Sequence, residues 1–297
     1  MRFFKLIRYQ NLILIGLIQS ILWLYIIPMY FIEPQMIGIE FVLLVLSSIC
    51  IAAGGNIIND IYDIEIDTIN KPNNVWIPSF LSYKKAWVLY ISITFIGLIF
   101  GWFTTIYSHQ SITFIWFVIP VGILFLYAYK LKKILFINNV IIALLVTYSI
   151  LVVVWMERNA LPNELIYSFS YKKIIWFLVI FSFGLNWSRE IVKDAQDLEG
   201  DKWANVNSIP AKYGIDFTKN FIQTILYFLM GIILAISASH FNNQPILVSY
   251  MILVILTSLI LLLIKLRKSN TIMDFNDLSF GMKLLMLLGI LSVFFIR

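Results

Sequence analysis

Charged residues are scarce in this 297-residue chain, at 13% of the total. A soluble domain carries about 25% of such residues, so the composition excludes an ordinary water-soluble fold. Hydrophobic residues make up 61% of the chain, and the mean hydropathy is +0.89. We therefore expect an integral, multi-pass membrane protein.

Cysteine and histidine are also rare. Cys50 is the one cysteine, which excludes a disulfide within the chain. The two histidines, His109 and His240, are far apart in the sequence and away from its acidic clusters. This pattern does not predict a transition-metal site.

Long apolar runs dominate what remains. Runs of about 18 or more apolar residues predict membrane helices. We expect nine, at residues 11–31, 37–59, 86–106, 112–129, 136–156, 172–188, 217–239, 244–264 and 279–296. Because no long linker separates them, they predict one all-α membrane domain over residues 1–297.

The basic residues predict the orientation of these helices. Most of the 22 Lys and Arg lie in the N-terminal tail and in the loops after the second, fourth, sixth and eighth predicted helices. By the positive-inside rule, these segments are cytoplasmic. We expect a cell (inner) membrane protein whose net charge of +6 reflects its topology, and no nucleic-acid partner.

One spacing of three aspartates, D-x2-D-x3-D, occurs twice, each time at the end of a membrane-length apolar run. The first copy is Asp60, Asp63 and Asp67, and the second is Asp194, Asp197 and Asp201. On a straight helix these offsets place the three carboxylates on one face. The copies end the second and sixth predicted helices, which suggests two pseudo-repeated four-helix halves plus a ninth helix.

Carboxylates are costly near a bilayer, so two such groups indicate a binding function rather than solvated helix ends. Mg²⁺ takes oxygen ligands and is commonly bound by one or two carboxylates together with substrate phosphates. Two carboxylate groups could hold a pair of ions on a diphosphate and neutralise the charge that grows as a carbon–oxygen bond breaks.

Three further features have two readings each. The lysines in Leu126–Lys133 are either topology anchors, or Lys132 binds diphosphate beside Tyr127 and Asn139. Asn11 either bonds a neighbouring helix or faces a cavity. The stretch 199–210, rich in turn formers, is either a connector or a lid over the cytoplasmic mouth.

Several segments together resemble the UbiA superfamily of intramembrane prenyltransferases. They are Asn59-Asp60-x2-Asp63-x3-Asp67, Asp194-x2-Asp197-x3-Asp201, Tyr127–Lys133 with Asn139, Leu6–Asn11, and Glu199-Gly200-Asp201 through Ser208-Ile209-Pro210 to Gly214. The resemblance covers nearly the whole chain. Within the superfamily, the segments 55–60 and 189–194 are most similar to the geranylgeranylglyceryl-phosphate geranylgeranyltransferase branch.

The resemblance implies nine helices around a central cavity and Mg²⁺-dependent transfer of a prenyl group from a polyprenyl diphosphate to a lipid, quinone-precursor or aromatic acceptor. The implied metal ligands are Asn59, Asp60, Asp63, Asp67, Asp194, Asp197 and Asp201. Catalysis is expected to depend on Asp63, Asp67, Asp194, Asp197 and Lys132. Substrate contacts are expected from Asn11, Asn59, Tyr127, Asn139, Arg189 and Lys193.

One departure and two rival functions remain. After Asp67 the family pattern continues N-R-P-x-R-P, whereas Asn70–Val75 lacks the second Arg and Pro, so that Lys71 or Lys84 would have to compensate. A CDP-alcohol phosphotransferase is a rival enzyme, but its continuous motif is absent. A transporter with ion-binding aspartates is the other rival, although such carboxylates usually lie near the midplane.

Overall fold

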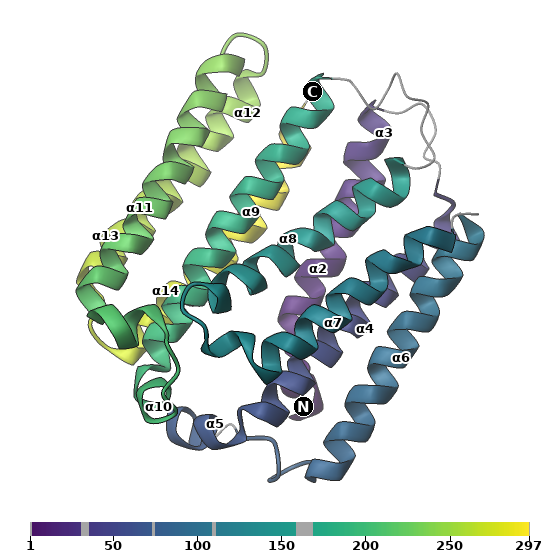
Figure 1. Cartoon of the computed structure of the whole chain (residues 1–297). Coiled ribbons are helices and arrows are strands. Elements are labelled where there is room, and N and C mark those ends of the chain that lie inside the picture. The colour runs from purple at the N-terminus through teal and green to yellow at the C-terminus, as the bar shows by residue number, and fades with distance from the viewer. Residues whose placement is uncertain (1, 31–35, 73–74, 109–110, 159–168, 297) are drawn as a thin grey trace. The chain divides into compact units, whose positions relative to one another are not determined.

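The computed structural model describes residues 2–30, 36–72, 75–108, 111–158 and 169–296. Within these ranges every regular element is a helix (Figure 1). Among the described residues, nine helical segments are long and apolar enough to cross a membrane, which confirms the predicted class. They are Tyr9–Met29, Gly38–Tyr62, Tyr83–Tyr107, Ser111–Tyr129, Ile137–Glu157, Ile174–Gln196, Ile209–His240, Pro245–Lys268 and Ile272–Phe295.

The chain divides into two compact units. The first is Met1–Lys133 with Tyr148–Lys172, and the second is Ile134–Thr147 with Lys173–Arg297. Each unit holds four whole spans, and the fifth span is divided between them. The sequence predicted four-helix halves with the ninth helix as the additional one, whereas here the additional helix is the fifth.

The first unit contains one short N-terminal helix and the first four spans. Its elements are α1 (Arg2–Leu6), α2 (Tyr9–Ile21), η1 (Leu22–Ile26), α3 (Ile27–Tyr30), α4 (Gly38–Tyr62), α5 (Ile64–Asn70), α6 (Tyr83–Tyr107), η3 (Ser111–Phe114), α7 (Ile115–Tyr129), η4 (Leu131–Lys133) and the second half of α8 (Ile137–Arg158).

The second unit contains the first half of α8 and the last four spans. Its other elements are α9 (Phe169–Gln196), α10 (Leu198–Trp203), α11 (Ile209–His240), α12 (Pro245–Tyr250), η6 (Met251–Leu256), α13 (Thr257–Lys268), α14 (Ile272–Leu291) and η7 (Ser292–Phe295).

Helices α4 and α6 lie side by side in the first unit (Figure 1). Small residues allow the close approach, because a Cβ added to Gly54 would lie 2.4 Å from Thr94 Oγ1. About two turns before Gly54 in α4, Ser47 Oγ donates a hydrogen bond of 2.7 Å to Gly97 O of α6. Small residues at helix contacts are typical of membrane proteins.

A buried apolar cluster lies under the first acidic motif. Leu6 of α1 joins Ile57, Ile58 and Ile61 of α4 and Ala86 of α6 in this cluster. The amide of Asn56 also donates a hydrogen bond of 2.8 Å to Ile7 O. The N-terminal helix is therefore packed against the end of α4 from which the motif begins.

Helix α9 packs against α11 and α14 in the second unit. A Cβ on Gly184 would lie 2.9 Å from Leu229 of α11, and one on Gly289 of α14 would lie 2.6 Å from Phe181 of α9. Gln196 Nε2, in the last turn of α9, donates a hydrogen bond of 2.9 Å to Phe275 O. These contacts hold the helix that carries the second motif.

Two of the predicted boundaries that differ from the structure lie at or just after the second motif. The seventh span begins at Ile209 rather than 217, because a first, less apolar helical segment precedes a kink at Gly214, whose φ and ψ are not helical. The stretch 199–210, predicted as a loop, includes α10. Glu199 and Asp201 lie in the first turn of α10, where acidic side chains favour a helix.

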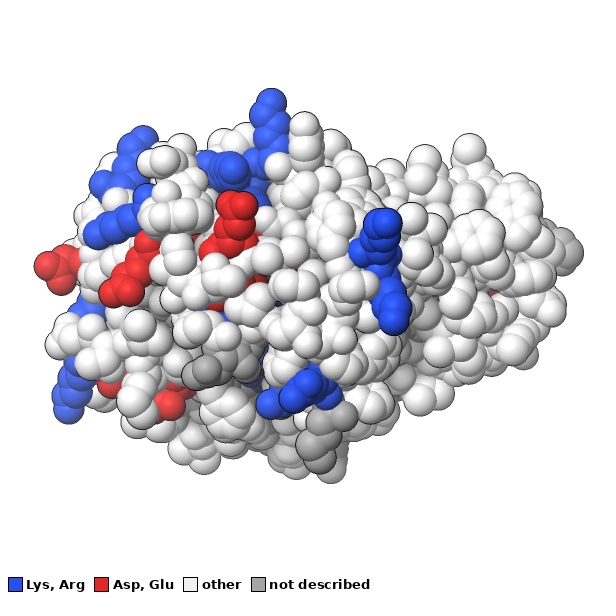
Figure 2. Space-filling model, turned by 90° about the horizontal axis from the view of Figure 1, so that it is seen from below, with Lys and Arg blue, Asp and Glu red and all other residues white. Residues whose placement is uncertain are grey.

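Charged side chains stand out against an otherwise uncharged surface on the face drawn in Figure 2. Large apolar side chains such as Val88, Phe95, Phe228 and Leu253 are more than half exposed. In water such exposure would be costly, whereas in a bilayer these side chains contact lipid.

Candidate active site

The two acidic motifs share a backbone geometry that the sequence did not predict. In each copy the long helix ends and a short one begins at the middle aspartate. Asp63 separates α4 from α5 with φ −98° and ψ 4°, and Asp197 separates α9 from α10 with φ −97° and ψ 13°. The expectation of one straight helical face is therefore wrong, in the same way in both copies.

Hydrogen bonding continues through each break. Asp63 N donates to Asn59 O at 2.9 Å, and Asp67 N donates to Asp63 O at 2.7 Å. The equivalent bonds of the second motif, from Asp197 N to Lys193 O and from Asp201 N to Asp197 O, are 2.9 and 3.0 Å. Like charges three and four residues apart destabilise a straight helix, and a bend at the middle charge changes that stacking.

In the first motif, carboxylates are held by cationic and amide groups. Arg8 Nη2 donates to Asp60 Oδ1 at 2.9 Å. Lys132 Nζ forms an ion pair with Asp63 Oδ1. The amide of Asn59 donates to the other oxygen of Asp63 at 2.7 Å. Charge-assisted bonds of this kind fix the carboxylates more firmly than neutral ones.

Asp67 lies in the first turn of α5 and is partly buried. Its burial, followed by the negative charge of Asp63, raises the pKa of Asp67 to about 6. The nearby positive charge of Lys71 acts in the opposite direction. The motif therefore holds two carboxylates whose mutual repulsion a bound cation would relieve.

Lys132 lies in η4 and is buried. A topology anchor would extend to water or lipid headgroups, so its burial favours the other reading of the sequence, in which Lys132 points inward. Its ion pair with Asp63 brings it to the first motif. The neighbouring Lys130 and Lys133 are exposed and fit the anchor reading.

In the second motif, two amides converge on one carboxylate oxygen. Asn138 Nδ2 and Asn139 Nδ2 donate to Asp194 Oδ2 at 3.1 and 2.9 Å. Both asparagines are buried near the start of α8. Asn139 was predicted to line a cavity with Lys132 and Tyr127. Asn139 contacts Asp194 of the second motif and Lys132 contacts Asp63 of the first, and the shared cavity stays a prediction.

Two cations precede Asp194 on α9. Lys193 Nζ contacts Glu190 Oε1 and Oε2 at 2.7 and 3.0 Å, and Arg189 Nη1 contacts Glu190 Oε1 at 3.2 Å. Arg189 and Glu190 are buried, whereas Lys193 is half-buried. Both predicted cationic residues therefore meet at one carboxylate.

The remaining aspartates lie at and after the second break. Asp197 occupies the break itself, and Asp201 is buried in α10. Within the part of the chain that the structure describes, no three His, Cys, Asp or Glu side chains form a group that could hold a metal ion. Metal binding by the seven residues named from the sequence stays a prediction.

Asn11 and Tyr127 are half-buried, in the first turn of α2 and the last turn of α7. No hydrogen bond joins the Asn11 side chain to the described residues of the first motif. The departure from the family pattern includes Asn74, which lies outside the described residues, as does His109. The substrate contacts expected of Asn11 and Tyr127 stay predictions.

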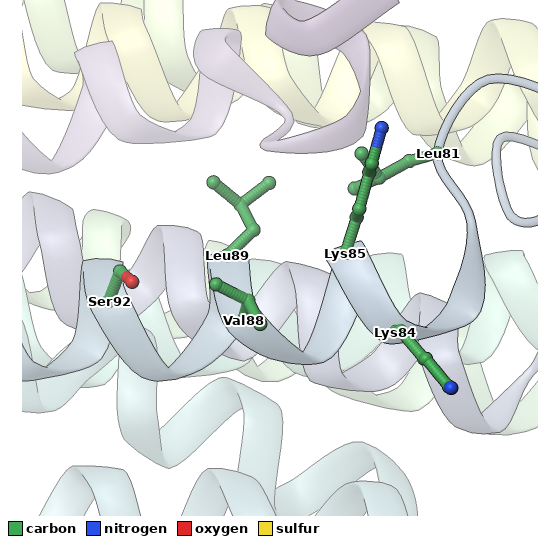
Figure 3. Close-up of a pocket in the computed structure, with 6 residues that line it drawn as sticks. All are labelled: Leu81, Lys84, Lys85, Val88, Leu89 and Ser92. Atoms are coloured by element: carbon green, nitrogen blue, oxygen red, sulfur yellow. The ribbon is translucent and has the colours of Figure 1, made fainter.

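Lys84, a possible substitute for the missing Arg, lies on α6. With Leu81, Lys85, Val88, Leu89 and Ser92 it lines a pocket of about 350 Å³. Figure 3 shows Lys84 and Lys85 extending from opposite sides of the helix. None of the predicted site residues lines this pocket. The pocket therefore gives no support to Lys84 as a ligand of the diphosphate.

Three residues in contact with the predicted site were not assigned to it. They are Arg8, Asn138 and Glu190, which contact Asp60, Asp194 and the cations Arg189 and Lys193, respectively. Each stands inside or beside a segment quoted above for its resemblance. The sequence shows that these residues lie near the motifs, but it does not show which motif residue each one contacts. Those contacts depend on how distant segments of the chain pack.

Comparison with known proteins gives the family. A model of the UbiA prenyltransferase family matches residues 20–287. The digeranylgeranylglyceryl phosphate synthase of Methanococcus aeolicus is 37% identical over 180 residues, covering 61% of this chain and 57% of that protein. The synthase of the same name from Sulfurisphaera tokodaii is 31% identical over 235 residues, covering 77% of this chain and 75% of that protein.

Solved structures give the same relationship. A digeranylgeranylglyceryl phosphate synthase in membranes has a TM-score of 0.63 and 27% identity, covering 98% of this chain and 96% of that one. A UbiA homolog from Archaeoglobus fulgidus bound to DMAPP and Mg²⁺ has a TM-score of 0.66 and 13% identity, covering 99% of both chains. The second likeness concerns the fold alone.

The matched segments of the two curated relatives thus span about half to three quarters of their lengths. The family model covers most of this chain, including both aspartate motifs. This match favours a prenyltransferase over a transporter or a CDP-alcohol phosphotransferase. The chain belongs to the UbiA prenyltransferase family.

Proposed function

We propose that this protein transfers a geranylgeranyl group from its diphosphate to geranylgeranylglyceryl phosphate and releases diphosphate. The observation that carries the proposal is the pair of acidic motifs with the same break at Asp63 and Asp197. The identity of the acceptor is supported by the relatives named digeranylgeranylglyceryl phosphate synthase. An aromatic or quinone-precursor acceptor is the alternative within the family.

Mg²⁺ fits the side chains that the motifs supply. The predicted ligands offer only oxygen atoms at the metal, in line with the preference of a hard cation. The raised pKa of Asp67 supports this assignment, because the repulsion from Asp63 that contributes to it would fall beside a cation. Once bound, Mg²⁺ would neutralise the charge that develops on the departing diphosphate.

The basic residues would contribute to the same charge neutralisation. Lys132, Arg189 and Lys193 are held by Asp63 and Glu190 rather than extended into solvent. We assign them to the oxygens of the diphosphate. Breaking the allylic carbon–oxygen bond would leave both electrons on the diphosphate. The acceptor hydroxyl oxygen would then bond to that carbon and lose its proton to water.

The membrane orientation is also part of the proposal. We place the N-terminus, both motifs and the basic loops on the cytoplasmic side of the cell membrane. The charge distribution in the sequence supports this orientation. It predicts that a Cys50→Ser protein with a new cysteine at exposed Lys130 reacts with an impermeant thiol reagent only in inverted vesicles.

The direct test supplies the purified protein with geranylgeranyl diphosphate, Mg²⁺ and one acceptor at a time. The acceptors are geranylgeranylglyceryl phosphate and a hydroxybenzoate, and products are identified by mass spectrometry. We expect digeranylgeranylglyceryl phosphate and an equal amount of diphosphate. Prenylation of the hydroxybenzoate alone would replace the proposed acceptor with the alternative.

A further inference from the structure

Glu190 contacts two cations of α9, Lys193 three residues after it and Arg189 immediately before it. Neighbouring residues point about 100° apart around a helix, so positions i and i+1 do not normally face each other. Nevertheless Arg189 Nη1 lies 3.2 Å from Glu190 Oε1, the oxygen that also receives Lys193 Nζ at 2.7 Å. The carboxylate of Glu190 is the shared partner of both side chains.

Burial makes this shared carboxylate necessary. Arg189 and Glu190 are 7% and 8% exposed. A buried cation is costly unless it is paired and hydrogen-bonded, and two adjacent cations repel each other. Glu190 offsets both effects and also restricts the rotamers of two long side chains. Without it, Arg189 and Lys193 would lose the anionic partner that they share.

The location of the group connects it to the second motif. Lys193 immediately precedes Asp194, and α9 carries all of these residues. Arg189 and Lys193 therefore both lie on α9 within the five residues that precede Asp194. A charged side chain that is held in place before the substrate arrives loses less conformational freedom on binding than a mobile one.

We propose that Glu190 is a positioning residue that holds Arg189 and Lys193 in the orientation in which they bind the diphosphate of the prenyl donor. This inference rests on the proposed function, because it requires a diphosphate substrate. It assigns to Glu190 no contact with the substrate itself. Its effect is expected in donor affinity, with little change in turnover at saturation.

The first test measures binding of a non-transferable prenyl phosphonate analogue with Mg²⁺ to full-length protein in detergent. Glu190→Gln keeps the size of the side chain and removes its charge. We expect about tenfold weaker binding, together with a raised KM for the donor and nearly unchanged kcat. Glu190→Asp, which keeps the charge, should recover part of the affinity. Glu199→Gln is the matched control, because Glu199 is an exposed carboxylate on the adjacent α10.

A double-mutant cycle asks whether Glu190 acts through Lys193. If it does, adding Glu190→Gln to Lys193→Gln weakens donor binding by much less than Glu190→Gln does alone. Full additivity in this cycle and in the same cycle with Arg189→Gln, or a lowered kcat with unchanged donor affinity, would overturn the positioning role. If the wild type transfers prenyl groups and Glu190→Gln binds the analogue equally well, this inference alone fails. If the wild type binds no prenyl diphosphate, the proposed function fails as well.

Discussion

Lys132 and Asp63 form an ion pair in which both side chains are largely buried, at 10% and 16% exposure. Removing one member of a buried pair leaves the other charge without compensation, which costs about 3 kcal/mol. We therefore expect Lys132→Gln and Asp63→Asn each to lower the thermal unfolding temperature. The double variant should recover most of that stability, because neither charge remains, yet should stay inactive.

Differential scanning fluorimetry and the prenyl-transfer assay on the same preparations separate these effects. Lys130→Gln is the matched control, since Lys130 is exposed and precedes the same short helix. A double variant as unstable as either single variant would contradict the pairing. Transfer by the double variant at the wild-type rate would remove both residues from the reaction.

Asn139 is expected to act through Asp194, to which its amide donates. Groups that orient a metal ligand typically affect metal affinity or activity by about 10- to 100-fold. We expect Asn139→Ala to raise the Mg²⁺ concentration needed for half-maximal transfer by about tenfold. A magnesium titration measures this, with exposed Asn220→Ala as control. An unchanged titration would mean that the amide has no influence on the motif.

Asp67 is expected to destabilise the metal-free protein at neutral pH. Its folded pKa of about 6 lies above the ordinary value, so the folded state binds more protons between about pH 4 and pH 6. Stability should therefore fall as the pH rises through this window. Asp67→Asn should gain about 1 kcal/mol near pH 7, after allowing for solvent screening, and nothing near pH 4.

Unfolding temperatures of both proteins in EDTA, measured across this pH range, test the sign. A pH-independent difference would show that the charge of Asp67 is not its cause. The same variant should lose transfer activity, because its stability gain comes from removing a proposed metal ligand.

Gly214 lies inside α11 with φ 83° and ψ 169°, a conformation essentially restricted to glycine. An added Cβ would meet no neighbouring atom, so backbone strain alone should destabilise Gly214→Ala, by about 2 kcal/mol. Gly231→Ala, in the same helix, also has open space and no such φ, so it should be neutral or slightly stabilising. Equal unfolding temperatures for the two variants would contradict this account.

The spans were predictable because a membrane helix is specified by a long apolar run, and such runs need no knowledge of tertiary contacts. The breaks at Asp63 and Asp197 were not, because residue spacing on an ideal helix does not reveal where the helix bends. The sequence did not distinguish whether Lys132 is a topology anchor or points inward, and its burial in the structure favours the inward orientation. The partners of Asp194 depend on the packing of α8 against α9, which no local pattern encodes.

The central claim is that the acidic motifs support Mg²⁺-dependent prenyl transfer, and Asp197→Ala tests it most directly. The measurement is the initial rate of digeranylgeranylglyceryl phosphate formation as Mg²⁺ is added to EDTA-treated wild type and variant. We predict no product without Mg²⁺, saturation in the wild type, and at least about a 100-fold lower rate in the folded variant. A wild-type rate independent of Mg²⁺, or a variant as fast as the wild type, would contradict the account.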